Sequence, residues 1–115
     1  MTCEPWDVVV VPFPFTDRPE TRRRPALVVS QPAFNSRGHT VLAMITSAAQ
    51  AGWPGDSPIG DLASAGLSRP CIVRLKLFTL DNRFILKKAG RLSETERAGV
   101  ARQIATWIFG STGAC

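Results

Sequence analysis

The stretch WDVVVVPFPFTDRPETRRRPALVVS, residues 6–30, decides the fold of this chain. Two parts of it, Val8–Phe13 and Ala26–Ser30, are continuous apolar runs rich in β-branched side chains, a pattern typical of strands covered on both faces. Between them, residues 16–24 are polar and rich in Arg and Pro, which predicts a loop. The loop ends in three consecutive arginines, Arg22 to Arg24. Because like charges repel unless an anion neutralises them, three guanidinium groups at the mouth of a buried strand predict a phosphate-binding site.

The rest of the chain reads as further short strands separated by turns. Asn-Ser-Arg-Gly at 35–38 is a turn signature, and the Gly- and Pro-containing segment 48–58 predicts a loop. Partial alternation of apolar and polar residues from Cys71 to Leu80 is typical of a half-buried strand. The other predicted elements are strands at Thr40–Ser47, near Ile59 and at Phe84–Lys88, and one helical turn at Asp61–Gly66.

The last predicted element is a helix. Ser93 can cap its start, with Glu96 three residues on as the second half of a capping box. Gly110 stands where a helix stop is expected. Several short strands followed by one helix predict a mainly β fold, a small barrel or curled sheet with the helix packed on it. The residues expected on the packed face of the helix are Val100, Ile104, Trp107 and Ile108.

Length and composition describe an ordinary globular chain with a basic surface. Its 115 residues predict a single domain, 1–115. Hydrophobic residues make up 44% and charged residues 20%, and the formal net charge is +5. That charge favours nucleic acid or an acidic protein as the partner.

The cysteines and the N-terminus indicate the compartment. Cys3, Cys71 and Cys115 are odd in number and far apart, so we expect reduced thiols rather than a zinc site or a disulfide framework. We expect no signal peptide, because the N-terminus lacks a basic region, and no membrane span. The prediction is a cytoplasmic protein.

Two strings of the opening stretch resemble the MazF/PemK family of toxins of type II toxin–antitoxin systems. They are Val-Pro-Phe-Pro-Phe-Thr-Asp at 11–17 and Arg-Arg-Pro-Ala-Leu-Val-Val-Ser at 23–30. Later blocks agree in order and spacing, so the resemblance spans nearly the whole chain. These blocks are Ile45–Ser47, Leu67–Leu75, Phe78–Asp81 and Gly90–Ser93.

The resemblance implies a homodimer of SH3-like barrels. It also implies a metal-independent, sequence-specific endoribonuclease (mRNA interferase) that needs no cofactor, cuts single-stranded RNA and is inhibited by a cognate antitoxin. The catalytic positions of the family fall on Arg24 and Thr46, with Ser47 beside them. The chain departs from the family at Trp6, where a glycine is usual, and at Lys76, where many relatives carry an amide or an acid. Our candidate RNA-binding residues are Phe15, Thr16, Asp17, Arg22, Arg23 and Lys76.

Cleavage without a metal can use the ribose 2′-hydroxyl as nucleophile, which requires stabilisation of the phosphorane and help for the leaving oxygen. The guanidinium group of arginine stays protonated near neutral pH because its pKa is very high, so it cannot accept a proton as a base. We therefore expect Arg24 to clamp the developing charge, and Thr46 with Ser47 to position a phosphate oxygen or the 2′-hydroxyl. A paired-histidine mechanism is excluded, since His39 is the only histidine, and the scattered aspartates do not support a two-metal site.

Two other functions stay open. One is a gyrase-poisoning toxin of the same fold that acts through a C-terminal Trp segment, although we expect Trp107 to pack on its own domain. The other is a non-catalytic nucleic-acid-binding barrel. Replacing Arg24 by alanine separates them, because gyrase poisoning would survive the change and RNA cleavage would not.

Overall fold

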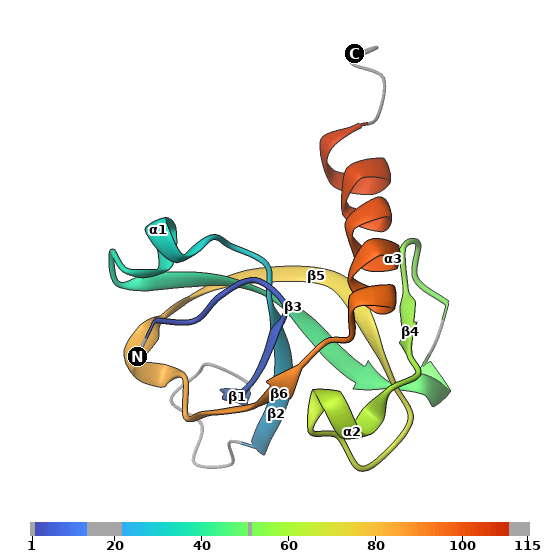
Figure 1. Ribbon diagram of the computed structural model, residues 1–115, viewed down its shortest axis with the longest axis horizontal. Helices are drawn as coiled ribbons and strands as arrows, with labels where there is room; N and C mark the ends of the chain where they lie inside the picture. Colours follow the sequence, from blue (N-terminus) through green and yellow to red (C-terminus); the bar gives the residue numbers. More distant parts are fainter. Residues whose placement is uncertain (1, 14–21, 51, 111–115) are drawn as a thin grey trace.

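The computed structural model describes residues 2–13, 22–50 and 52–110. Six antiparallel strands form one sheet in the order β4-β5-β3-β2-β1-β6, and the sheet curls while α3 rises from one side of it (Figure 1). The strands are β1 (Asp7–Phe13), β2 (Arg22–Val28), β3 (His39–Ser47), β4 (Ser57–Ile59), β5 (Cys71–Asp81) and β6 (Lys87–Arg91). The helical elements are α1 (Pro32–Asn35), η1 (Ala48–Gln50), α2 (Leu62–Ala65), η2 (Asn82–Phe84), α3 (Glu94–Ile104) and the π-helical turn η3 (Ala105–Phe109). The predicted mainly β fold with a C-terminal helix is confirmed.

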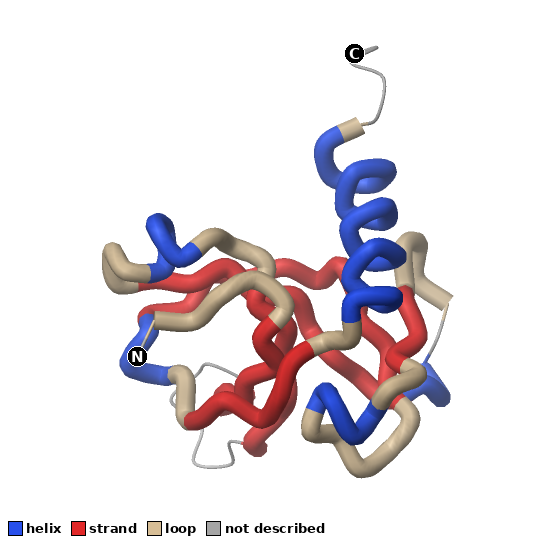
Figure 2. Tube along the Cα trace, viewed as in Figure 1, coloured by secondary structure: helices blue, strands red, loops and turns tan. Residues whose placement is uncertain are grey.

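Both faces of the central strands are buried, as the valine run predicts. Val8 and Val9 follow one another in β1, point to opposite faces, and are both fully buried. Val8 packs with Leu27 and Val100 of α3 on one face, whereas Val9 packs with Leu42 on the other. The sheet is therefore the middle layer between two apolar clusters, and the helix covers one of them (Figure 2).

The two edge strands are not paired with each other in the described residues, and α2 packs on the edge strand β6. The Ser64 hydroxyl donates to the carbonyl of Arg91 in β6 at 2.9 Å. Gly66 ends α2 at φ +72°, and a Cβ there would lie 2.1 Å from the carbonyl oxygen of Ala89. Only glycine fits this approach and this backbone conformation. The predicted helical turn stopped by Gly66 is confirmed, and it brings α2 onto β6.

Three predicted boundaries are wrong. Arg22, Arg23 and Arg24 are not in a loop but begin β2, where they pair with Phe13, Pro12 and Val11 of β1. The segment after the second strand forms the short helix α1 before its turn. The last strand runs from Lys87 to Arg91 rather than from Phe84. In each case long-range pairing or packing, which local composition does not encode, sets the end of the element.

The predicted capping box at the start of α3 does not form. The Ser93 hydroxyl donates to Glu96 Oε1 at 2.9 Å and makes no hydrogen bond to a helix amide. Glu96 Oε2 instead accepts the backbone N–H of Gly60 and, at 3.2 Å, that of Asp61. These amides after β4 offer donors from a distant part of the chain, so Glu96 ties the helix to β4.

The expected packed face of the helix is correct only for its first half. Val100 is buried and Ile104 is half-buried against the core. Trp107 and Ile108, by contrast, are 55% and 47% exposed, and neighbouring Phe109 is 79% exposed. The helix leaves the sheet as it rises (Figure 1), so the side chains of its last turn are only partly covered in this single chain.

Trp6 has an unusual backbone for its residue type. Its φ is +75°, in the left-handed region that favours glycine. Its N–H donates to the carbonyl of Val28 at 2.8 Å and its carbonyl accepts from Leu92 at 2.9 Å, so both neighbouring segments hold it there. The indole packs against the buried cluster around Val8. This side-chain packing compensates for the strain at a position where the resemblance led us to expect glycine.

None of the described helices is long and apolar enough to cross a membrane. Cys3 and Cys71 are both free thiols, and Cys115 lies outside the described residues.

Candidate functional site

The mouth of β2 opens onto a cavity of about 390 Å³. Ala26 of β2 pairs with Met44 of β3, and continuing this antiparallel register by two residues brings Arg24 opposite Thr46. Both residues line the cavity. The complete lining consists of Arg22, Arg23, Arg24, Pro25, Ile45, Thr46, Ser47, Arg69, Pro70 and Cys71.

Arg24 is held on its strand with part of its hydrogen-bonding capacity unused. It is half-buried, and its guanidinium lies 5.9 Å from the centroid of the Phe13 ring. Its Nε is buried and has no hydrogen-bond partner among the described residues. A buried donor without a partner is costly. Arg24 therefore keeps hydrogen-bonding capacity that none of the described residues satisfies.

Thr46 and Ser47 end β3 at the same cavity. Thr46 is half-buried and Ser47 is exposed, with its Oγ accepting from the backbone N–H of Ala49 at 3.3 Å. Cys71, the partner of Ser47 in β5, also lines the cavity. Burial raises the pKa of the Cys71 thiol, so it stays protonated near neutral pH and is a poor nucleophile. The hydroxyls are the neutral donors of this site.

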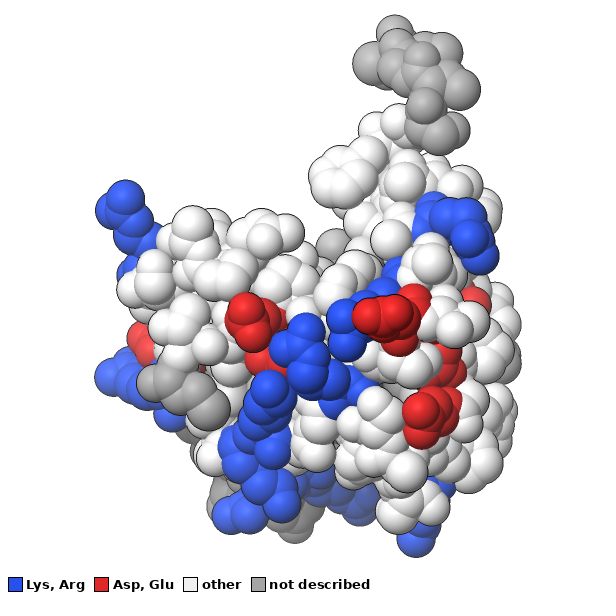
Figure 3. All heavy atoms as spheres, viewed as in Figure 1, with Lys and Arg blue, Asp and Glu red and all other residues white. Residues whose placement is uncertain are grey.

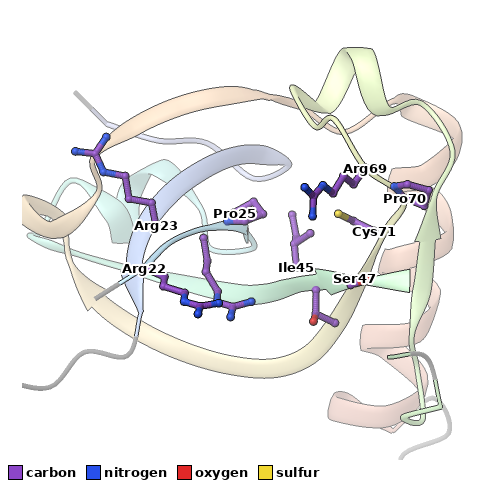
Figure 4. Close-up of a pocket in the computed structure, with 10 residues that line it drawn as sticks. Arg22, Arg23, Pro25, Ile45, Ser47, Arg69, Pro70 and Cys71 are labelled. Carbon is purple, nitrogen blue, oxygen red and sulfur yellow. The ribbon is translucent and has the colours of Figure 1, made fainter. Parts of the chain in front are cut away.

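Further arginines surround the Arg24–Thr46 pair. Arg69 lies across the cavity, and its guanidinium points toward Ile45 and Pro25 (Figure 4). Arg22 lines the same cavity, whereas the Arg23 guanidinium turns away from the labelled residues of β3 and β5 (Figure 4). Of the two arginines predicted to bind RNA, the cavity geometry therefore favours Arg22.

Sequence reasoning missed Arg69, although a signal was present. Arg69-Pro70 directly precedes the buried start of β5, just as Arg24-Pro25 precedes the buried part of β2. The two Arg-Pro steps meet across one cavity. The predicted residues Phe15, Thr16 and Asp17 lie outside the described residues.

A second cavity, of about 220 Å³, adjoins the first on the other side of Arg24 and Thr46, which line both. The predicted RNA-binding residue Lys76 lies here and is exposed. The complete lining consists of Phe13, Arg24, Met44, Thr46, Gln50, Arg74 and Lys76.

Arg74 is the buried cation of this second cavity, at 9% exposure. Its Nε donates to Asp56 Oδ1 at 3.2 Å and its Nη2 to Asp56 Oδ2 at 3.0 Å. Its Nη2 also donates to the Gln50 carbonyl, and the Trp53 ring centroid lies 4.8 Å from the guanidinium. The Arg74 hydrogen bonds, together with the N–H groups of Trp53 and Gly52, hold the pKa of Asp56 below its usual value.

The basic surface over β6 is partly neutralised by neighbouring carboxylates. Asp7 is 2% exposed and forms ion pairs with Arg91 at 2.7 Å and Lys88 at 3.1 Å. Arg91 also lies 3.5 Å from Glu4. Figure 3 shows this band of basic side chains meeting acidic ones. Asp7 and Glu4 line neither cavity of the candidate site, so their carboxylates neutralise this band and not the cations of the two cavities.

Comparison with known proteins identifies the family. The sequence profile described as "PemK-like, MazF-like toxin of type II toxin-antitoxin system" matches residues 4–108. The chain belongs to this family. No curated protein sequence matches it. Within the described residues, no cluster of three or more His, Cys, Asp or Glu side chains could hold a metal ion.

Solved structures of this toxin family share the fold. MazF from Deinococcus radiodurans is 21% identical with a TM-score of 0.72, and the match covers 95% of this chain and 98% of that one. The MazE–MazF complex from the same organism gives 20% identity, a TM-score of 0.75 and the same coverages. A mycobacterial endoribonuclease in complex with its cognate antitoxin gives 17% and 0.72, covering 90% and 92%.

Proposed function

We propose that this toxin is a metal-independent endoribonuclease that cleaves single-stranded RNA at the Arg24–Thr46 pair. The observation that carries the proposal is Arg24 itself, a half-buried guanidinium with an unpartnered Nε on the border of two cavities. A phosphate placed there has a nucleotide on each side, and the two cavities supply room for both. The family membership supports the same reading.

In this proposal the ribose 2′-oxygen attacks the adjacent phosphorus and the bond to the 5′-oxygen breaks. The products are a 2′,3′-cyclic phosphate and a 5′-hydroxyl. Arg24 donates to the oxygens that gain charge in the phosphorane, and the Thr46 hydroxyl positions a non-bridging oxygen. Preorganised donors of this kind act where charge develops.

Neither cavity has a carboxylate or an imidazole among its described lining residues. His39 begins β3 and lines neither cavity. The described residues therefore contribute charge stabilisation and not base catalysis. In the proposed reaction the 2′-proton passes to solvent and the leaving oxygen receives a proton from Arg24 or water.

Arg22 and Arg69 would hold flanking phosphates in this reaction. Both are exposed and line the first cavity from opposite sides. Contacts of this kind bind the backbone without reading sequence, and they weaken with salt. We assign Ser47 to the same role as a neutral donor.

The deciding experiment incubates the purified protein with a long, protein-free RNA in EDTA, beside Arg24→Ala. We expect defined fragments with 2′,3′-cyclic phosphate ends from the wild type alone. Intact RNA with the wild type, or equal cleavage by Arg24→Ala, would contradict the proposal. Melting temperatures of the two proteins control for folding.

We further propose that the cognate antitoxin covers the first cavity with an acidic segment. The net charge of +5 and the arginines of this cavity support that choice. Hydrogen exchange of the toxin–antitoxin complex tests it, because β2 amides from Arg22 to Arg24 should gain protection. Unchanged exchange there would contradict an antitoxin seated on the cavity.

A homodimer, working in the cytoplasm where mRNA lies, completes the proposal. An apolar groove of about 500 Å³ supports dimerisation, because it runs between the sheet and α3 and is lined by Trp6, Leu77 and Ile108 among others. Light scattering of the purified toxin tests this part. A monomer at micromolar concentration would contradict it.

Gyrase poisoning is a second candidate function. One observation supports it, the exposure of Trp107, Ile108 and Phe109. If it were the activity, Trp107→Ala would abolish toxicity and Arg24→Ala would not. The ribonuclease proposal expects the opposite result.

A further inference from the structure

Strand β5 is irregular beside the candidate site. Ala43 of β3 pairs with Leu77, but the next residue, Met44, pairs with Arg74. Two residues of β5, Leu75 and Lys76, therefore have no partner in this step. Bulges of this kind re-aim side chains and are common next to active sites. Here Arg74 and Lys76 both come to line the second cavity.

The bulged segment faces a loop that is organised around one carboxylate. Asp56 Oδ2 accepts the backbone N–H groups of Gly52 and Trp53, both at 3.0 Å, in addition to the Arg74 guanidinium. Arg74 in turn holds the carbonyl of Gln50. One buried cation thus holds Gln50 and the segment from Gly52 to Asp56 at the rim of the second cavity. We call this Arg74–Asp56–Trp53 arrangement the clasp.

The clasp does not occupy the side-chain groups of the second cavity that could contact a ligand. The Gln50 side chain and the Lys76 ammonium are exposed, and neither has a hydrogen bond or ion pair with another described residue. With Arg24 and Arg74 they make most of the polar lining of the cavity hydrogen-bond donors, and the side-chain acceptors are those of Gln50 and Thr46. The volume of about 220 Å³ suits one base beside the ridge of Arg24 and Thr46.

We propose that the second cavity is a subsite for the base next to the cleaved phosphate, that it prefers bases with a keto edge, and that the clasp positions it. This inference rests on the proposed ribonuclease function. Guanine and uracil present carbonyl oxygens to a donor-rich lining, and Lys pairs well with guanine O6 and N7. Adenine and cytosine present an amino group instead, which would face cations. Lys76 reads the edge, and Arg74 is a positioning residue that holds Gln50 and Trp53.

An ion pair beside an aromatic ring is common enough that a control within the chain is needed. Arg83 provides it, since it pairs with Asp81 at 3.6 Å and lies 5.0 Å from the Phe84 ring centroid. Its side chain is 75% exposed and lines neither cavity of the site. Arg83→Gln removes the same chemistry away from the proposed subsite.

The experiment sequences the ends made by each variant from a randomised single-stranded RNA library. We expect the wild type to favour G or U over A and C at one of the two positions that flank the cut. Lys76→Glu should shift this position toward amino bases, and Asp56→Asn and Arg74→Gln should flatten it, each by about tenfold in relative cleavage. Arg83→Gln should keep the wild-type profile.

The outcomes separate the subsite from the function. A wild-type profile in Lys76→Glu and Asp56→Asn would overturn the subsite while cleavage stands, and so would an amino preference in the wild type. If the wild type cuts no RNA, the proposed function fails, and selection of the same library on immobilised protein then judges the subsite. The subsite proposal would be overturned if the selected RNA showed no position enriched in G or U, or if Lys76→Glu left that enrichment unchanged. Lys76 has an exposed side chain, so its variants test the proposal even if Arg74→Gln does not fold.

Discussion

Arg24 of β2 and Thr46 of β3 line the same two neighbouring cavities and form the ridge between them. They come together because β2 and β3 pair in register from Ala26 and Met44 inward, which leaves the start of β2 beside the end of β3. A guanidinium and a hydroxyl on a rigid sheet are preorganised donors for a phosphate.

The charge of Arg24 alone should be insufficient for cleavage. We expect Arg24→Ala to lower the single-turnover rate by about 10²–10³-fold. Arg24→Lys should recover only part of that loss, because an ammonium cannot make the bidentate contact. Arg37→Ala is the control, since Arg37 is exposed and lines neither cavity. A fully active Arg24→Lys would show that a point charge is enough.

The hydroxyl of Thr46 should matter more than its shape. Thr46→Val keeps the branched side chain and removes the donor, so we expect the rate to fall roughly 10²-fold. Thr46→Ser should stay within about tenfold of the wild type, because it keeps the hydroxyl. Rates on one short RNA under single-turnover conditions measure both. Equal losses in the two variants would assign Thr46 to packing instead.

The clasp should make stability depend on pH at the acidic end. Because Arg74 lowers the pKa of Asp56 in the folded state, the unfolded chain binds the Asp56 proton more readily, near its ordinary pKa of about 3.9. The stabilisation is therefore complete above that pH and is lost as pH falls through the folded pKa. We expect Asp56→Asn to be less stable than the wild type to urea at pH 7, with the difference shrinking below about pH 4. A difference that persists undiminished at pH 2 would mean that the charge of Asp56 contributes nothing.

Two glycines should respond to alanine with opposite signs. Gly66→Ala places a Cβ 2.1 Å from the Ala89 carbonyl oxygen at φ +72°, so we expect a loss of more than about 1 kcal/mol in the free energy of unfolding. Gly99 lies inside α3 with open space around it, and Gly99→Ala should add about 0.5–1 kcal/mol. Urea unfolding of both variants gives the comparison. A neutral Gly66→Ala would show that α2 can move away from β6.

Much of this protein was predictable from local sequence. The valine run, the apolar segment after Pro25 and the capped turn at Gly66 each predict their element, because period, β-branching and a left-handed stop act over a few residues. The family resemblance placed Arg24, Thr46 and Ser47, and these three do meet at one cavity. The sequence by itself therefore determined the class of fold and the centre of the candidate site.

The tertiary structure alone decided the surroundings of that centre. Arg69 joins the site because β5 lies beside β3, and Arg74 faces the second cavity because of the irregular step between Met44 and Ala43. Glu96 accepts hydrogen bonds from backbone amides after β4 instead of capping α3, and the last helical turn is exposed. The physical reason is that each of these arrangements depends on strand pairing and packing between residues far apart in the chain, which local sequence does not encode.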